Sequence, residues 1–277
     1  MYNRSLIWIT LSLFSLAMNT AWASSTDAMP APLTFGIVPQ QAATKLAKLW
    51  GPIIRHISDK TGYPIQFRTA PNIPEFERRL GKGKYDLSYM NPYHYVTFNK
   101  SSGYRAFAKQ KDKKIVGILV TNKIDPVESL RELQGKTLVF PSPAAFAASI
   151  LPRAFLRKEG IHFQPKYVSS HDSVYQNVSR GFFPAGGGIV RTLKNNPTDI
   201  QGKLAILWKS PGYTPHAFAA HPRVPQAVIE RIREAMINMG RSTEGKKLLA
   251  AIKFKGIEGA VPGDWDDVRK LGIHLLD

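Results

Sequence analysis

The stretch that decides the fold is residues 169–192, SSHDSVYQNVSRGFFPAGGGIVRT. It predicts a capped helix, then a very short strand, then a glycine-rich turn that opens a second helix. Ser170 and Asp172 suit the N-terminus of the first helix, and Val174 and Val178 follow at helical spacing. Helices and strands that alternate at such short intervals are typical of an α/β sheet.

The same stretch predicts a site for a small anion. Helix N-termini carry unpaired N–H groups and the positive end of the helix dipole, so they attract negative charge. Two such termini would lie close together here, and they offer these candidate ligand contacts: His171, Asp172, Gly187, Gly188, Arg191 and Thr192. No side chain in the stretch has the pattern of a nucleophile beside its base. We therefore expect a binding site and not an enzyme active site.

Two of these assignments have a structural alternative. His171 can act as a helix-capping residue alone, without touching a ligand. The run Gly186-Gly187-Gly188 can be a tight turn or a bulge that no ligand approaches. It is not a nucleotide-binding P-loop, because no Gly-Lys-Ser/Thr sequence follows at the required spacing.

Outward from this stretch, short buried strands alternate with amphipathic helices along the chain. Strands are predicted near residues 33–38, 65–68, 85–90, 104–109, 114–121, 137–140, 164–168 and 204–208. This order predicts a parallel α/β sheet in the first part of the chain and a second α/β unit after it. We place the first lobe at residues 24–121 and 212–277 and the second at residues 122–211, with a ligand cleft between them.

The N-terminus has the pattern of a secretory signal peptide at residues 1–23. Arg4 supplies the positive charge, residues 6–18 are mostly apolar, and Ala21-Trp22-Ala23 fits the small-x-small rule for cleavage near Ala23. A helix that spans a bilayer needs about 20 apolar residues, and this run is shorter, so we expect no stable membrane insertion. The chain has no cysteine for a lipid anchor, and we therefore expect a free protein in the periplasm.

The composition argues against several classes of protein. With no cysteine, the chain can form neither disulfides nor thiolate metal sites. His216 and His221 lack the context of a zinc motif, and we expect no metal and no cofactor. The net charge is +18, or +17 once Arg4 leaves with the signal peptide, and it either keeps the protein soluble or draws anions into the cleft. The basic residues are scattered without an RNA-recognition pattern, so we expect no nucleic-acid partner.

Short motifs follow one another through nearly the whole mature chain: Phe35-Gly36-Ile37-Val38-Pro39, Trp50-Gly51-Pro52-Ile53, Thr61-Gly62, Leu80-Gly81-Lys82-Gly83-Lys84-Tyr85-Asp86-Leu87, Asn91-Pro92-Tyr93, Leu133-Gln134-Gly135-Lys136 and Ser170-His171-Asp172. Together they resemble the phosphate/phosphite/phosphonate family of periplasmic binding proteins, which serve ABC importers. The resemblance implies a type II fold of two α/β lobes that close over an oxyanion without catalysis. It also implies a small anionic ligand and a membrane permease as partners, and we expect the binding protein to be a monomer.

The resemblance also assigns roles to particular residues. Tyr93 would line the first lobe's side of the cleft, and His171 would contact the oxyanion. The segment from Ser142 to residue 148, with Ala144 and Ala145, would be a helix start that cradles the anion. Tyr93 can instead be a core tyrosine whose hydroxyl is satisfied within the protein.

The chain departs from the family at two places. Its predicted helix start, residues 143–148, reads PAAFAA and lacks the hydroxyl groups that relatives carry there. Arg191 and His216 stand where binders of aminophosphonates need acidic residues. An ammonium group next to Arg191 would be repelled, so the sequence argues against an aminophosphonate ligand.

Two functions of different classes fit these observations. The first is a periplasmic solute-binding protein that captures a small oxyanion and delivers it to an ABC importer. The alternative is a ligand-sensing subunit that signals to a membrane histidine kinase. An exported hydrolase is disfavoured, because no nucleophile–base pair and no metal cluster appears in the sequence.

Overall fold

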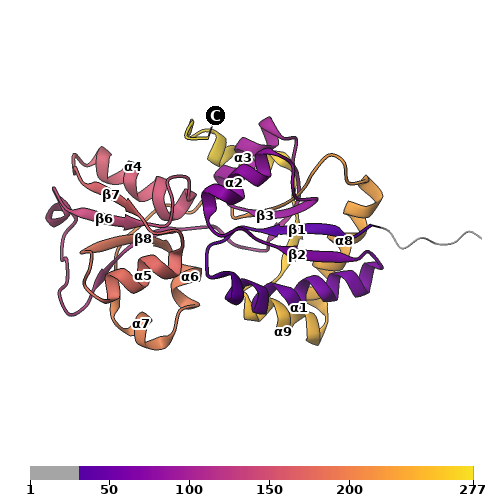
Figure 1. The fold of residues 1–277 in the computed structure, drawn as a ribbon, viewed down its shortest axis with the longest axis horizontal. Coiled ribbons are helices and arrows are strands. Elements are labelled where there is room, and N and C mark those ends of the chain that lie inside the picture. The colour runs from indigo at the N-terminus through magenta and orange to yellow at the C-terminus, as the bar shows by residue number, and fades with distance from the viewer. Residues whose placement is uncertain (1–30, 277) are drawn as a thin grey trace, which may run out of the picture. The chain divides into compact units, whose positions relative to one another are not determined.

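Two β-sheets organise the part of the chain that the computed structural model describes, residues 31–276. Helices pack around both sheets, which are drawn next to each other in Figure 1. We call each sheet with its helices a lobe. The signal peptide predicted at residues 1–23, with its cleavage near Ala23, lies outside the described residues.

Lobe 1 contains a six-stranded sheet in the order β11-β4-β10-β3-β1-β2. Strands β1, β2 and β3 are parallel, while β10 and β11 join in antiparallel pairings. Its strands are β1 (Leu33–Ile37), β2 (Ile65–Arg68), β3 (Leu87–Met90), β4 (Arg105–Gln110), β10 (Ala217–Ala220) and β11 (Ile257–Gly259). Its helices are α1 (Ala43–Thr61), α2 (Ile73–Gly81), α3 (Pro92–Ser101), α8 (Gln226–Asn238), α9 (Thr243–Ala251) and α10 (Asp266–Arg269).

Lobe 2 contains a five-stranded sheet in the order β7-β6-β8-β5-β9. Strand β6 runs parallel to β7 and β8, and β5 runs antiparallel to β8 and β9. Its strands are β5 (Gly117–Asn122), β6 (Thr137–Phe140), β7 (Gln164–Tyr167), β8 (Ala185–Ile189) and β9 (Leu204–Lys209). Its helices are α4 (Leu151–Lys158), α5 (His171–Ser179), α6 (Val190–Lys194) and α7 (Thr198–Gly202), and a wide π-helical turn (Phe146–Ile150) precedes α4.

The chain crosses from lobe 1 to lobe 2 earlier than the boundary predicted at residue 122. Strand β5 pairs with β8 and β9, so it belongs to lobe 2 and the first crossing lies at residues 111–116. The return crossing lies at residues 210–216, and the two crossings touch at the bridge between Ile115 and Tyr213. Residues 117–122 are all buried, so their composition alone does not reveal which of two sheets covers them.

The glycine run predicted to be a turn is instead a strand in the interior of the lobe 2 sheet. Gly186, Gly187 and Gly188 lie within β8. A Cβ on Gly187 would come 1.9 Å from the carbonyl oxygen of Ala148, and one on Gly188 would come 2.1 Å from the hydroxyl of Tyr175. The glycines therefore let the π-helical turn and α5 pack directly on the strand.

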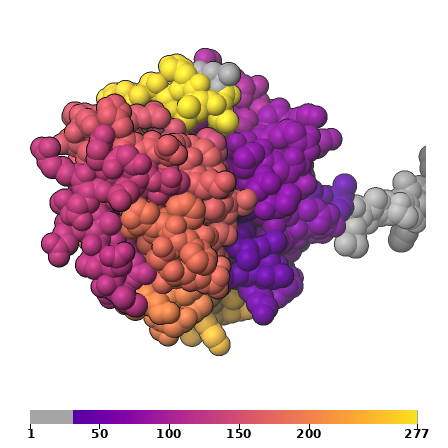
Figure 2. All heavy atoms as spheres, turned by 60° about the vertical axis from the view of Figure 1, so that its left-hand side comes forward, coloured from indigo at the N-terminus to yellow at the C-terminus, as the bar shows by residue number. Residues whose placement is uncertain are grey.

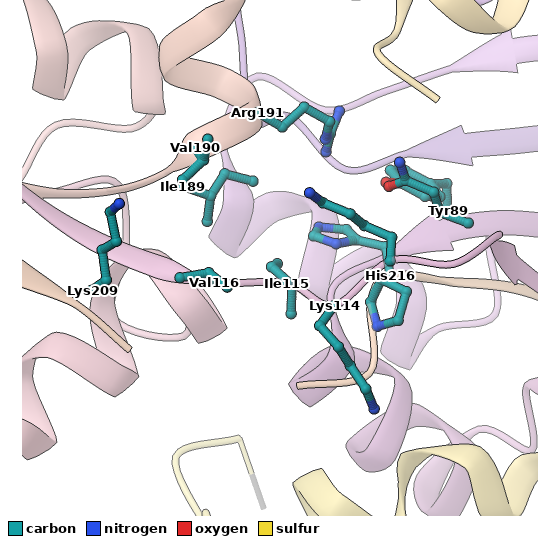
Figure 3. Close-up of a pocket in the computed structure, with 12 residues that line it drawn as sticks. Tyr89, Lys114, Ile115, Val116, Ile189, Val190, Arg191, Lys209 and His216 are labelled. Atoms are coloured by element: carbon teal, nitrogen blue, oxygen red, sulfur yellow. The ribbon is translucent and has the colours of Figure 1, made fainter. Parts of the chain in front are cut away.

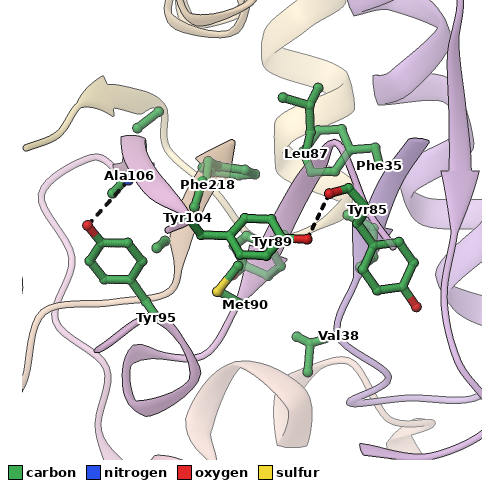
Figure 4. Close-up of a cluster of buried hydrophobic side chains, with 14 of the residues drawn as sticks. Phe35, Val38, Tyr85, Leu87, Tyr89, Met90, Tyr95, Tyr104, Ala106 and Phe218 are labelled. Atoms are coloured by element: carbon green, nitrogen blue, oxygen red, sulfur yellow. Dashed lines mark hydrogen bonds between the residues drawn. The ribbon is translucent and has the colours of Figure 1, made fainter. Parts of the chain in front are cut away.

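The core of lobe 1 contains many aromatic side chains (Figure 4). The buried hydroxyl of Tyr104 donates to the carbonyl of Tyr85 at 2.7 Å, and that of Tyr95 accepts from the N–H of Ala106 at 3.3 Å. Residues 144–148 of lobe 2 belong to the same apolar cluster. Apolar packing is therefore continuous from one lobe into the other, and in Figure 2 the purple and orange atoms meet along one boundary.

Candidate functional site

A cavity of about 240 Å³ lies between the two lobes, beside the crossing segments. Lobe 1 contributes Tyr89 and Gln110, and the crossings contribute residues 113–116 together with Pro215 and His216. Lobe 2 contributes residues 189–191 and Lys209. Figure 3 shows Ile115 and Val116 facing Ile189 and Val190, with Arg191 and His216 toward one end and Lys209 toward the other.

The cavity is strongly cationic. Lys113, Lys114, Lys209 and Arg191 line it, and no aspartate or glutamate is among its described lining residues. Lys114 lies 3.6 Å from the carboxylate of Asp267. Within the described chain, Lys113 and Lys209 have no carboxylate at ion-pair distance. A cleft whose charges have one sign attracts solutes of the opposite sign, so this cavity is suited to an anion.

Arg191 is fixed in the cavity by its place in the chain and by contacts with lobe 1. It follows β8 directly, in the first turn of α6, so the rigid strand fixes its backbone. Its Nη2 donates to Oε1 of Gln40 at 2.6 Å. Its guanidinium lies 5.9 Å from the ring centre of Tyr89 and 5.8 Å from that of Phe254. A lobe 2 cation thus rests on aromatic rings of lobe 1, with N–H groups left over for a ligand.

His216 adds a neutral polar group to the same cavity. Its ring stacks on Tyr89, with centres 4.9 Å apart and an angle of 20° between the planes. Burial, and after it the positive charge of Arg191, lowers the pKa of His216 well below its ordinary value. Its Nε2 is buried and has no hydrogen-bond partner among the described residues. A buried nitrogen without a hydrogen-bond partner favours the binding of a ligand that forms this hydrogen bond.

His171 lies apart from this cavity. It begins α5 as predicted, and its backbone N–H donates across the lobes to the carbonyl of Gln40 at 2.9 Å. Its Nδ1 is 3.0 Å from Oγ1 of Thr192, which is itself 2.8 Å from the hydroxyl of Tyr175. Burial, and after it the charge of Arg191, lowers the pKa of His171 to about 3. His171 and Thr192 are therefore parts of a buried polar network beside the cavity.

We expect the affinity for an anion of constant charge, such as a sulfonate, to change less than about twofold between about pH 6 and pH 8. The pKa of His171 starts at about 3, so a nearby anion would have to raise it by several units before the imidazole could bind a proton in this range. Calorimetry at several pH values checks this. Binding that weakens tenfold toward pH 8 would show that an imidazolium forms in the complex.

Asp172 joins the lobes. Its carboxylate accepts from Nε2 of Gln41 at 3.3 Å, and it lies 3.6 Å from Nζ of Lys45. Asn196 of lobe 2 also donates to it, at 3.1 Å. We call this set of contacts the interlobe clasp; its members are Gln40, Gln41 and Lys45 of lobe 1 and His171, Asp172 and Arg191 of lobe 2.

The structure places Tyr93 away from the cavity. Tyr93 lies on α3, is buried, and accepts a hydrogen bond from the N–H of Leu276 at 2.8 Å. It borders a separate void beside the C-terminal segment. Tyr93 therefore fits the alternative of a core tyrosine whose hydroxyl is satisfied within the protein. Tyr89 on β3 is the tyrosine that lines the cavity.

The predicted anion cradle at residues 142–148 is filled by the protein. Ala144 and Ala145 are buried, and the carbonyl of Ala144 accepts from Nδ2 of Asn91 at 3.2 Å. Phe146 packs edge-on against Tyr213, with ring centres 5.5 Å apart. The void that remains here is about 10 Å³, enough for about one water molecule. The hydroxyl of Ser142 is buried and has no hydrogen-bond partner in the described chain.

The sequence therefore located only part of the cavity. Among the predicted residues Arg191 and His216 line it, whereas Gly187, Gly188, Thr192, His171 and Asp172 lie outside its lining. The lysines and Tyr89 were missed. Lys113 lies between the strands predicted at residues 104–109 and 114–121, and Lys114 begins the second of them. An earlier crossing point would have indicated both lysines.

Comparison with known proteins identifies the family. The family model for the periplasmic substrate-binding protein of phosphonate ABC transporters matches residues 35–267. The chain belongs to this family. The resemblance seen in the motifs is thereby confirmed, and membership implies an exported periplasmic protein with a small ligand and a membrane permease as its partner. Among the described residues, no helix combines the length and the apolar character needed to cross a bilayer.

Members and structural neighbours of the family are similar over most of their length. The phosphate-import protein PhnD of Mycolicibacterium smegmatis is 21% identical over 234 residues, which cover 76% of this chain and 73% of the relative. A binding protein component of an ABC phosphonate transporter from Pseudomonas aeruginosa has a TM-score of 0.80 at 16% identity. The match covers 87% of this chain and 85% of the Pseudomonas chain. PhnD1 from Prochlorococcus marinus, solved in complex with methylphosphonate, has a TM-score of 0.79 at 18% identity. The match covers 87% of this chain and 97% of PhnD1. These likenesses confirm the predicted type II fold.

Proposed function

We propose that this protein captures a small anion in the cavity between its lobes and delivers it to the permease of an ABC importer. The observation that carries the proposal is the cationic cavity, which has four lysine and arginine side chains and no acidic one among its described lining residues. The ligands named for its relatives, phosphate and methylphosphonate, are anions of this kind. In this proposal the protein acts without catalysis, as a monomer, after cleavage of its leader near Ala23.

Binding would depend on closure of the two lobes. Tyr89 and Gln110 approach the cavity from lobe 1, while Arg191 and Lys209 approach it from lobe 2. An anion that touches both sets stabilises the closed form by its differential affinity for that form. The two crossing segments also line the cavity, so the ligand would sit next to the hinge.

The test is calorimetric titration of the exported protein, freed of bound ligand by unfolding and refolding. We expect at least one of phosphate, phosphite, methylphosphonate and sulfate to bind, and cationic amino acids not to bind. A binding anion at about 100 times its dissociation constant should raise the free energy of unfolding by about 2.7 kcal/mol. If the folded protein binds none of a broad panel of inorganic and organic anions, the proposal is wrong.

A further inference from the structure

We infer that the ligand is an organic anion with an apolar body and no cationic group, whose acidic group is bound by Arg191 beside the crossing segments. This inference rests on the proposed function and narrows its ligand class. It also moves the binding site away from the helix start at residues 142–148.

The helix start cannot receive a tetrahedral anion in this closed arrangement. Its void is only about 10 Å³, and the helix start lines it with Ala145, Phe146, Ala147 and Ala148, which offer no side-chain hydroxyl group. The polar side chains that line the rest of the void are Gln40, Asn91, His171 and His216. Ala144, Phe146 and Ala148 are each 1% exposed, so the packing against lobe 1 leaves no room. An anion there would have to displace Phe146 from its contact with Tyr213.

The cavity beside the crossings has the size and walls of an organic ligand's site. A cavity volume of roughly 10–15 Å³ already accommodates one water molecule, so a bare tetrahedral anion would fill only part of a cavity of about 240 Å³. The space between its charged ends is bordered by Ile115, Val116, Ile189 and Val190. Apolar walls stabilise a ligand in proportion to the apolar surface that it buries there.

The polar groups of the cavity indicate which charged and hydrogen-bonding groups the ligand carries. Among the described residues, the Arg191 guanidinium donates one hydrogen bond, to Gln40, and its other N–H groups suit an oxyanion. The unpartnered Nε2 of His216 is available to a hydrogen-bonding group of the ligand. No acidic side chain among the described lining residues could compensate an ammonium group, and Arg191, Lys113 and Lys209 would repel it.

A series of n-alkylphosphonates, from methyl to butyl, tests the inference by calorimetry at one pH. Each methylene that enters the apolar part should tighten binding about three- to fourfold, so that butylphosphonate binds roughly 30-fold or more tightly than methylphosphonate. 2-Aminoethylphosphonate has the shape of propylphosphonate with an ammonium in place of the terminal methyl. We expect it to bind at least about tenfold more weakly than propylphosphonate.

A substitution shows where the alkyl chain lies. Val116→Trp fills the space between the apolar walls and should remove most of the dependence on chain length. Ile206→Trp is the matched control, because Ile206 is 38% exposed on β9 of lobe 2 and lies outside the cavity lining. Thermal unfolding of both ligand-free variants checks that they are folded. If neither variant folds, the alkylphosphonate titrations of the wild-type protein still test the inference.

The outcomes separate this inference from the proposed function. A rise in affinity with chain length, lost in Val116→Trp alone, supports the inference. Phosphate or methylphosphonate binding as tightly as butylphosphonate overturns it and leaves the proposed function intact. The absence of binding to every anion by the folded wild-type protein overturns both.

Discussion

Arg191→Glu should weaken the binding of an anionic ligand by more than about 30-fold, which corresponds to roughly 2 kcal/mol. Arg191 is the one arginine among the described residues that line the cavity, and the substitution places a negative charge where the proposed ligand's own charge would lie. Repulsion in a partly desolvated site is stronger than at an exposed surface. Calorimetric titration with the tightest anion of the alkylphosphonate series measures the effect.

Two further variants separate the possible causes. Arg180→Glu makes the same charge change at an exposed position of lobe 2 and should leave affinity within about threefold. Gln40→Ala removes the side-chain partner of Arg191 but keeps the cation, so it should cost much less than Arg191→Glu. Equal affinities for wild-type protein and a folded Arg191→Glu variant would place the anion elsewhere and contradict the site.

Gly187→Ala should lower the free energy of unfolding by at least about 2 kcal/mol. Its Cβ would lie 1.9 Å from the carbonyl oxygen of Ala148 and 2.6 Å from the ring of Phe140. Backbone cannot move aside as the end of a flexible side chain can, so β8 and the π-helical turn would have to separate. Urea unfolding followed by circular dichroism measures the change.

Gly202→Ala is the matched control for this prediction. Gly202 lies at the end of α7, and nothing comes within 4 Å of a Cβ built there. Alanine in such an open helical position should leave stability unchanged or raise it by up to about 1 kcal/mol. A Gly187→Ala protein with the wild-type unfolding midpoint and slope would show that the strand does not need its glycines for close packing.

The glycine run shows why the sequence predicted the elements better than their roles. Helix α5 begins at His171 as expected, because Ser170 caps it locally by accepting from the N–H of Ser173 at 3.1 Å. Gly187, in contrast, is required by Ala148, which lies far from it in sequence. A glycine without its packing partner cannot be distinguished from a glycine in a turn.

Site residues that local sequence places were predicted, and several that packing between the lobes places were not. Arg191 was predicted because the strand–helix junction that places it is local. Tyr89 lies on β3 and Tyr93 on the next element, α3, and both are buried aromatic residues. Which of them borders the cavity depends on how lobe 2 and the crossings pack against lobe 1, and no local pattern records that. The helix start at residues 142–148 was the clearest departure from the family in sequence, and the structure gives it a packing role.

The interlobe clasp is made entirely of the protein's own groups. It therefore favours a fraction of closed molecules before any solute arrives, and the apparent dissociation constant equals the intrinsic one divided by the binding-competent fraction. A stronger clasp would raise that fraction and tighten capture from dilute solution. If the lobes open when the ligand is handed to the permease, as the proposed function implies, the contacts between Gln41, Lys45 and Asp172 would have to break. Tight capture and rapid hand-over would thus make opposite demands on these three side chains.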